Sequence, residues 1–359
     1  MFSNRHRRPG SRPRIQFCAA IAGALLALSF NAAAEEPIKI GLVLAKQGNM
    51  AEQSEYLSKG TYLALEQQGN KILGKPAEIV WLDEPSPQEA QQSMQRLIDV
   101  HKVVAVLGGG ISANALAMSA LAKRAKIPYI ANNAAATDLT GKECNRYTFR
   151  IQSPVSVQAR ALAPHLATMG KRWYLLTASY AFGQDIVDSF SAWLDEAGGT
   201  VVGSDQVPLN TPDYSSFILK IRQSKPDVVV GGLAASDLST FLKQWEELGM
   251  KDKIPFAEIA IGDTDIWSVG KKAATGIFTK PWYYNDPDNT PEDKAFVKAY
   301  QEKYKRPPAD KAWMAWYAMR ALLQSIEQAG TTEAGAIVQA LEKWRDDSGS
   351  VPAYYRRWD

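Results

Sequence analysis

Short apolar runs alternate with amphipathic stretches through most of this 359-residue chain, and that alternation constrains the fold more than any other feature. The runs are continuously apolar, which is typical of parallel strands that helices cover on both faces. Read in chain order, the pattern is strand, helix, strand, helix, as in a doubly wound sheet. The sequence therefore predicts an α/β protein built on open parallel sheets.

The pattern is interrupted after about residue 131 and then restarts, which predicts two sheets. A chain of this length exceeds the size at which one core usually stops growing. No low-complexity linker separates the halves, so we expect two Rossmann-like lobes whose strand ends face each other across a cleft. The predicted strands are 38–44, 78–82, 103–108, 128–131, 173–177, 200–207, 227–232 and 254–261. The predicted helices are 51–68, 87–100, 113–125, 155–169, 183–197, one opened by Thr211-Pro212, 236–248, 292–304, 310–328 and 332–344.

The N-terminus has the layout of a cleavable secretory signal. Five arginines precede residue 15 without an acid, residues 17–30 are apolar, and small residues lead to Glu35. This favours cleavage after Ala34 and a periplasmic location, with a retained amphipathic anchor as the alternative. The apolar run of 14 residues is shorter than the roughly 20 that a helix needs to span a bilayer.

Charge and composition exclude several classes of function. The chain has 41 basic and 38 acidic residues, and the predicted signal holds five of the basic ones, which leaves 36 against 38. No basic patch suggests nucleic acid. Cys144 is the one cysteine after residue 34 and is expected to be buried. His101 and His165 are not spaced as metal ligands, and no phosphate loop or hydrolase elbow occurs, so no metal or cofactor is expected.

A glycine-rich segment at 108–110 links a predicted strand to the helix that follows. Glycines let the backbone approach a ligand closely. Ser112 and Ala113 stand at the start of the helix, where free N–H groups and the helix dipole attract an anion such as a carboxylate. The alternative is that Ser112 only caps its own helix.

Three further segments follow predicted strands or lie within one. Asn133 and Ala135 belong to a run of small residues that either leaves room for a ligand or forms a turn. Tyr180 and Phe182 suit the apolar wall of a cleft or ordinary packing. Glu258 falls inside an apolar strand, where an unpaired acid is costly, so its partner is either a ligand ammonium or a nearby Lys or Arg.

Taken together, these segments resemble the type I periplasmic solute-binding proteins of ABC importers, the branched-chain amino acid-binding family, over nearly the whole chain after the signal. The resemblance implies no enzyme and two lobes, residues 37–153 with 277–335 and residues 154–276 with 336–359, joined by three hinge crossings that close on a ligand. Its local marks are residues 38–41, 107–109, 136–141, 180–183 and 208–216.

The resemblance also implies roles for single residues. Ser112 matches the serine that holds the ligand carboxylate, with Asn133 among the backbone contacts. Phe182 lies near the aromatic position, with Tyr180 as its neighbour, and Glu258 lies close to the acid that meets the ligand ammonium. Cys144 matches a position often disulfide-bonded in relatives but has no partner here.

Two departures leave the ligand open. Ala135 stands where amino acid binders usually carry a threonine, and Ala234 where they often carry a tyrosine. Each lost charge-assisted hydrogen bond is worth roughly 1.5–3 kcal/mol. Relatives with the 180–183 and 208–216 patterns resemble binders of aromatic or other organic acids, so the ligand is a branched-chain or related amino acid or such an acid.

The resulting hypothesis is a monomeric periplasmic receptor that captures a small carboxylate and delivers it to a membrane permease. One alternative is an exported ligand sensor that acts on a separate membrane partner. Another is a secreted α/β hydrolase, which needs a nucleophile beside His101 or His165. The abrupt end of the chain after 351–359 suggests a piece of a longer protein.

Overall fold

The computed structural model describes residues 35–259, 261–280, 282–346 and 353–354. The predicted signal of residues 1–34 and most of the stretch after residue 346 lie outside these ranges. Within them, no helix is long and apolar enough to cross a membrane.

The first sheet has six strands in the order β2-β3-β1-β4-β5-β6. All neighbours are parallel except β2, which pairs antiparallel with β3 in a hairpin that the sequence did not reveal. The strands are β1 Ile38–Val43, β2 Lys71–Ile72, β3 Lys75–Leu82, β4 Ala105–Gly108, β5 Tyr129–Ala131 and β6 Thr148–Arg150.

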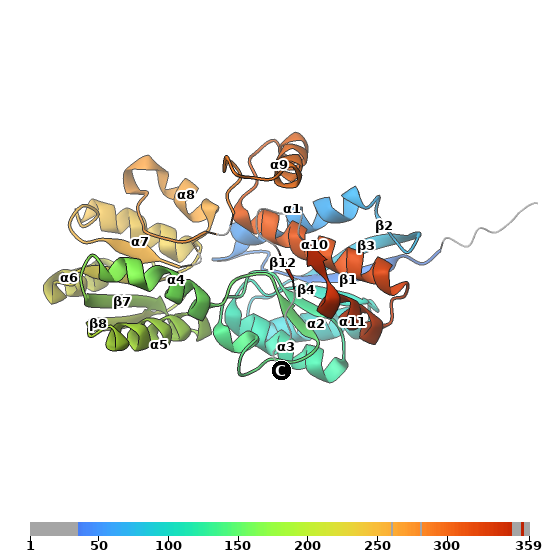
Figure 1. The fold of residues 1–359 in the computed structure, drawn as a ribbon, viewed down its shortest axis with the longest axis horizontal. Coiled ribbons are helices and arrows are strands. Elements are labelled where there is room, and N and C mark those ends of the chain that lie inside the picture. Colours follow the sequence, from blue (N-terminus) through green and yellow to red (C-terminus); the bar gives the residue numbers. More distant parts are fainter. Residues whose placement is uncertain (1–34, 260, 281, 347–352, 355–359) are drawn as a thin grey trace, which may run out of the picture. The chain divides into compact units, whose positions relative to one another are not determined.

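Helices cover both faces of this sheet and complete the first lobe. One face packs on the first and last helices of the chain, and α10 runs alongside α1 in Figure 1. The other face packs on α2 and α3. The helices are α1 Ala51–Gln67, α2 Pro87–Asp99, α3 Ser112–Ala125, the short η1 Thr137–Leu139, α9 Pro291–Tyr304, α10 Asp310–Ala329 and α11 Ala334–Lys343.

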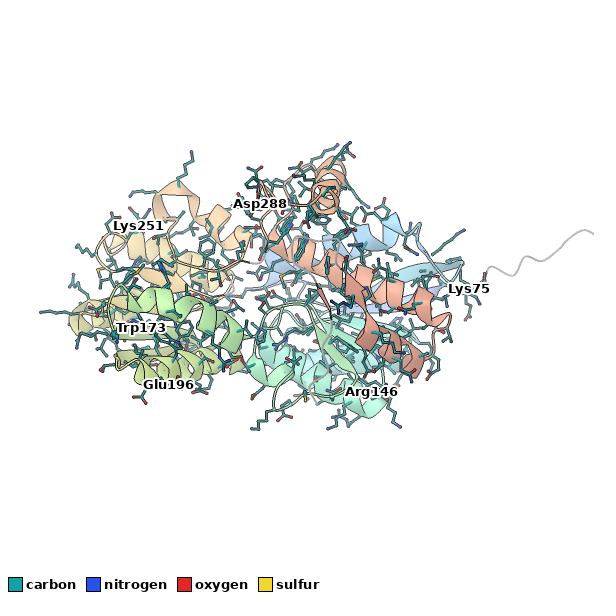
Figure 2. The ribbon with its side chains drawn as sticks, in the orientation of Figure 1. Lys75, Arg146, Trp173, Glu196, Lys251 and Asp288 are labelled. Carbon is teal, nitrogen blue, oxygen red and sulfur yellow. The ribbon has the colours of Figure 1, made fainter. Side chains whose placement is uncertain are left out.

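The second sheet has four parallel strands in the order β10-β9-β7-β8 and forms the second lobe. One face packs on α4 and α5, and the other on α6 and α7. Trp173, labelled among the green elements in Figure 2, is fully buried and stacks on Trp193 at 5.8 Å. The elements are α4 Val155–Ala167, β7 Arg172–Ala178, α5 Ala181–Glu196, β8 Thr200–Val207, α6 Ser215–Ser224, β9 Val228–Gly232, α7 Ser236–Glu247, β10 Phe256–Glu258 and α8 Asp263–Ala273.

The predicted two-lobe α/β architecture is thus confirmed, but two of the predicted lobe boundaries differ from those in the structure. Ile277 still pairs with Ala257 of the second sheet, so the return to the first lobe lies between Ile277 and Trp282, which packs in the first core. The assignment of residues 336–359 to the second lobe is wrong for α11, because its apolar face packs in the first core. Arg146, labelled in Figure 2, also binds Glu342 of α11. The first crossing joins β6 to α4, whereas the third crossing, expected between residues 335 and 336, does not lie there, because α11 packs in the first core.

Three local expectations were wrong. The helix expected to open at Thr211-Pro212 begins at Ser215, because Tyr214 N–H is held by Gln244 Oε1 (2.6 Å) in a non-helical turn. The strand expected at 254–261 ends at Glu258, and the unpredicted helix α8 follows. Cys144, expected to be buried, is exposed. A short strand pair, β11 Arg345–Asp346 with β12 Ala353–Tyr354, ends the described chain.

The contact between α1 and α10 gives a test of the first core. A Cβ added at Gly60 would meet the carbonyl of Ala312 well inside van der Waals contact and Trp316 N at 3.0 Å. The backbone of α10 cannot move aside as easily as a flexible side chain. Gly60→Ala is therefore expected to lower the free energy of unfolding by about 3 kcal/mol. Urea denaturation followed by far-UV circular dichroism measures this.

Gly335→Ala is the matched control, since its Cβ would meet only the flexible carboxylate of Glu333, at 3.1 Å. Alanine is the better helix former by about 1 kcal/mol, so this variant should match or exceed the parent protein in stability. Equal stability of the two variants would contradict the packing of α1 on α10.

Candidate ligand-binding site

Each sheet has a switch point, where successive crossover helices leave on opposite faces. The strand orders place it between β1 and β4 in the first sheet and between β7 and β9 in the second. In open parallel sheets, ligands bind outside the carboxyl ends of the strands at this point. A ligand is therefore expected to bind near the loops that follow β1, β4, β7 and β9.

These loops do line one cavity. It is narrow, about 30 Å³, and a single water needs about 10–15 Å³. Six of the eight predicted site residues line it, drawn from both lobes, while Ala113 and Glu258 do not. The lining residues are Met50, Gln53, Gly110, Ser112, Asn133, Ala135, Tyr180, Phe182, Ala234 and Lys311. We call this the cleft cavity.

Ser112 is the first residue of α3 and is almost fully buried. It does not cap its own helix: Ile111 is the N-cap residue, and Ser112 Oγ instead accepts a hydrogen bond from Ala136 N–H at 3.1 Å. The hydroxyl proton remains available for an acceptor in the cavity. The first N–H groups of a helix have no partner within it, so those of Ser112 and Ala113 add to the same region.

The glycine segment before Ser112 is held by a buried acid. Gly108 and Gly109 have φ of +146° and +83°, which side chains rarely adopt. Gly110 N–H donates to Glu84 Oε1 at 2.7 Å, and Oε2 is buried without a partner among the described residues. Burial raises the pKa of Glu84 to about 8, with the Gly110 hydrogen bond acting in the opposite direction. Glu84 is therefore largely protonated at neutral pH.

Three hydrogen bonds fix the loop after β5 to neighbouring segments. Asn133 Nδ2 donates to Gly110 O at 2.9 Å, which joins this loop to the glycine segment. The carbonyl of Ala135 accepts from Val155 N–H at 2.8 Å, at the start of α4. Arg150 Nη1 donates to Ala136 O at 2.8 Å. The loop is thus fixed at the point where the chain crosses into the second lobe.

The second lobe supplies an aromatic pair to the cleft cavity. The rings of Tyr180 and Phe182 stack with centroids 6.0 Å apart, just before and within the first turn of α5. Burial raises the pKa of Tyr180, and the charges of Asp237 and Glu258 act in the same direction, so its hydroxyl keeps its proton. The carbonyl of Ala234 accepts a weak hydrogen bond from Asn49 Nδ2 at 3.4 Å, which joins the lobes across the cavity.

Glu258 does not line the cavity, although its charge acts on Tyr180, which does. It is fully buried, and its Oε2 accepts from Leu233 N–H at 3.1 Å while Oε1 has no partner among the described residues. Neither a Lys nor an Arg of the described chain forms an ion pair with it, which contradicts the second of the two alternatives given for its partner, while the first, a ligand ammonium, stays a prediction. Burial raises its pKa well above the usual range, aided by the charge of Asp265.

Sequence reasoning missed Met50, Gln53 and Lys311. Gln53 faces inward because it shares the buried side of α1 with Tyr56 and Leu57. Lys311 is 2% exposed, at the second position of α10. A signal for it was present: a helix N-terminus disfavours a cation, and Lys311 lies in the first turn of α10.

A buried polar joint lies beside Lys311 and links the lobes. Asp263 N–H donates to Asp310 Oδ1 (3.0 Å), and Asp310 N–H donates to Asp263 Oδ2 (2.7 Å), so each aspartate caps the other's helix. Lys280 binds Asp263 and lies 3.6 Å from Asp310. Burial opposes ionisation of Asp310, but the charges of Lys311 and Lys280 outweigh it and lower its pKa.

A second cavity of about 210 Å³ lies where the chain crosses between lobes, and Lys311 borders it as well as the cleft cavity. Its walls come from both crossing segments and from α4, together with the polar joint. The remaining lining residues are Gln152, Ser153, Val157, Gln158, Ala161, Ile261, Thr279, Lys280 and Asp310.

The hydrolase alternative has no support in this arrangement. His101 and His165 do not line the cleft cavity. The described residues also contain no group of three acidic, histidine or cysteine side chains placed to hold a metal ion.

Comparison with known proteins gives a consistent answer. The sequence pattern of the family described as "Periplasmic binding protein" matches residues 37–359. The chain is 26% identical to "Leu/Ile/Val-binding protein homolog 8" of Brucella suis biovar 1 (strain 1330), over 95% of this chain and 89% of that protein.

Two solved structures are similar over most of the chain. A periplasmic binding protein from Burkholderia mallei has a TM-score of 0.82 and 26% identity, covering 89% of this chain and 86% of that one. A solute-binding protein of an ABC transporter from R. palustris, in complex with benzoate, has a TM-score of 0.81 and 25% identity, covering 89% of both chains.

The raised pKa of Glu84 predicts a pH dependence of stability. Between its ordinary pKa of 4.5 and about 8, the folded protein holds a proton that the unfolded chain has released. Stability from this group is therefore complete below pH 4.5 and falls as pH rises, by at most about 1.4 kcal/mol per pH unit. Glu84→Gln keeps an acceptor for Gly110 and should remove this decline, measured by urea denaturation at pH 5 and pH 8.

Glu302→Gln is the control, because Glu302 is exposed on α9. Its stability should follow that of the parent protein at both pH values. Parallel behaviour of the Glu84→Gln variant would mean that Glu84 is ionised in the folded state.

Proposed function

The chain belongs to the family of periplasmic binding proteins, and we propose that it binds a small carboxylate in the cleft cavity as the substrate-binding component of an ABC importer. Family and fold are those of binding proteins, not of enzymes. The observation that carries the proposal is the meeting of switch-point loops from both sheets in one cavity around Ser112.

The first lobe would hold the carboxylate. Ser112 Oγ accepts from Ala136 N–H, so its hydroxyl proton is free to donate to a ligand oxygen. The unpaired N–H groups at the start of α3 and the positive end of its dipole favour an anion at the same place. An Oγ donor and backbone donors together match the two oxygens of one carboxylate.

The second lobe would cover the rest of the ligand. Tyr180 and Phe182 offer a flat apolar wall, and Ala135 and Ala234 leave space where larger side chains would intrude. The similar R. palustris protein is a complex with benzoate, a small carboxylate with a flat apolar body. A ligand of this kind suits the combination of anion site and aromatic wall.

Binding would be coupled to movement of the lobes. A cavity of about 30 Å³ cannot admit even a small organic acid unless its walls separate. The crossing segments after β6 and between Ile277 and Trp282 are the places where backbone rotation can open it. The ligand favours the closed arrangement by the contacts it makes only there.

The proposed partner is the membrane permease of the importer, which would recognise the closed form. We propose a monomer that works in the periplasm after removal of residues 1–34. Nothing in the site favours the alternative of a ligand sensor over delivery to a permease, so the importer role is preferred on family grounds.

Isothermal titration calorimetry of the protein lacking residues 1–34, against small aliphatic and aromatic carboxylates and amino acids, tests the proposal. At least one acid should bind saturably, and Ser112→Ala should weaken it about tenfold, by loss of one charge-assisted hydrogen bond. Ser216→Ala, an exposed serine on α6, should leave the affinity unchanged. Absence of saturable binding by every acid, or equal affinity of the Ser112→Ala variant, would refute the assigned site.

A further inference from the structure

The position of Lys311 is unfavourable for a cation in three respects. Its side chain is almost completely buried, which penalises the ammonium charge. It lies in the first turn of α10, where the helix dipole is positive. Its ion-pair partner among the described residues is Asp310, at 3.6 Å, beyond hydrogen-bond length. The buried ammonium of Lys311 thus has N–H donors without a hydrogen bond within the described chain, and an additional anion nearby would stabilise it.

Asp310 is itself already engaged. Its Oδ1 accepts from Asp263 N–H at 3.0 Å and lies 3.6 Å from Lys280 Nζ, while its Oδ2 lies 3.6 Å from Lys311 Nζ. The polar joint therefore gives Lys311 the nearby charge of Asp310 but no hydrogen bond. The cleft cavity, which Lys311 borders together with Ser112, is the place where an anion would meet both the ammonium and the hydroxyl.

The acids near the cavity are poorly placed for a ligand ammonium. Glu84 has a pKa of about 8, and the pKa of Glu258 is raised well above its usual range, both through burial. Asp265, whose pKa burial raises to about 6, accepts from Gln53 Nε2 (3.0 Å) and Gly262 N–H (2.7 Å). Asp237, whose pKa burial also raises, accepts from Asn210 N–H (3.1 Å). None of the four lines the cavity.

We propose that Lys311 is the counter-ion of the ligand carboxylate and that the cleft selects carboxylates with a flat apolar body and no α-ammonium group. This rests on the proposed function and names its ligand class. An α-amino acid would bring a second cation toward Lys311 without an ionised acid in the cavity wall to receive it. A ring would lie against Tyr180 and Phe182, whose paired faces favour stacking.

Matched ligand pairs test the selectivity on the unmodified protein. Calorimetry would compare 3-phenylpropanoate with phenylalanine and 4-methylpentanoate with leucine, since each pair differs only by the ammonium group. The acid should bind at least about tenfold more tightly than the amino acid in both pairs. Benzoate should likewise exceed benzamide, its uncharged analogue, by about tenfold or more.

Variants test the role of Lys311. Lys311→Met should weaken binding of the best acid about 10- to 100-fold, while Lys311→Arg, which keeps the charge, should bind it more tightly than Lys311→Met. Lys298→Met removes an exposed lysine on α9 and is the matched control. Circular dichroism melting curves would establish that each variant is folded.

A double-mutant cycle separates the two cavities that Lys311 borders. If Lys311 and Ser112 hold the same carboxylate, the losses caused by Lys311→Met and Ser112→Ala should not add. Additive losses would place the action of Lys311 in the cavity at the crossings and overturn the proposal.

Two other outcomes also overturn it while leaving the proposed function intact: tighter binding of the amino acid in either pair, or unchanged acid affinity of Lys311→Met. Absence of binding by every acid and amino acid would instead refute the proposed function itself. The ligand pairs need no variant, so the test stands even if Lys311→Met does not fold.

Discussion

The parallel direction of the strands is the constraint on which this site depends. Parallel neighbours require crossover helices, so the carboxyl ends of all main strands, and the loops after them, lie at one edge of each sheet. At the two switch points the loops diverge and leave space between them. Ser112 and Phe182, which are 70 positions apart, therefore line the same small cavity without any direct pairing between their strands.

The polar joint explains how the two lobes are held and where they can turn. Asp263 and Asp310 each occupy a helix N-terminus, where a carboxylate is favoured by the dipole, and each satisfies the other's N–H. Lys280 offsets their repulsion. Separating them would leave buried charges unpaired, which costs several kcal/mol. The proposed opening of the cleft would therefore be easier as a rotation about this joint than as a separation of its two aspartates.

The sequence predicted the architecture well because continuous apolar runs and helical periodicity are local signals. Six of its eight site residues line the cleft cavity, most of them on loops that follow strands, and their role in binding stays a prediction. It failed where long-range packing decides: α11 joins the first core through its apolar face, and Glu258 ends a strand three residues earlier than expected. Lys311 was missed because its place in the first turn of a helix is its only local mark, whereas its burial depends on α10 lying against α1 and near the crossings.

The electrostatic character of the cleft follows from burial rather than from the count of charges. No acid among the described residues lines the cavity, burial raises the pKa of Glu84 and of Glu258, and the oxygens of Asp265 accept from Gln53 and Gly262. The cation Lys311 stays in the wall, held near Asp310 but not hydrogen-bonded to it. The proposed preference for an anion follows from this arrangement, because one ammonium contributes positive charge to the cavity wall and no acid of the described chain lines it.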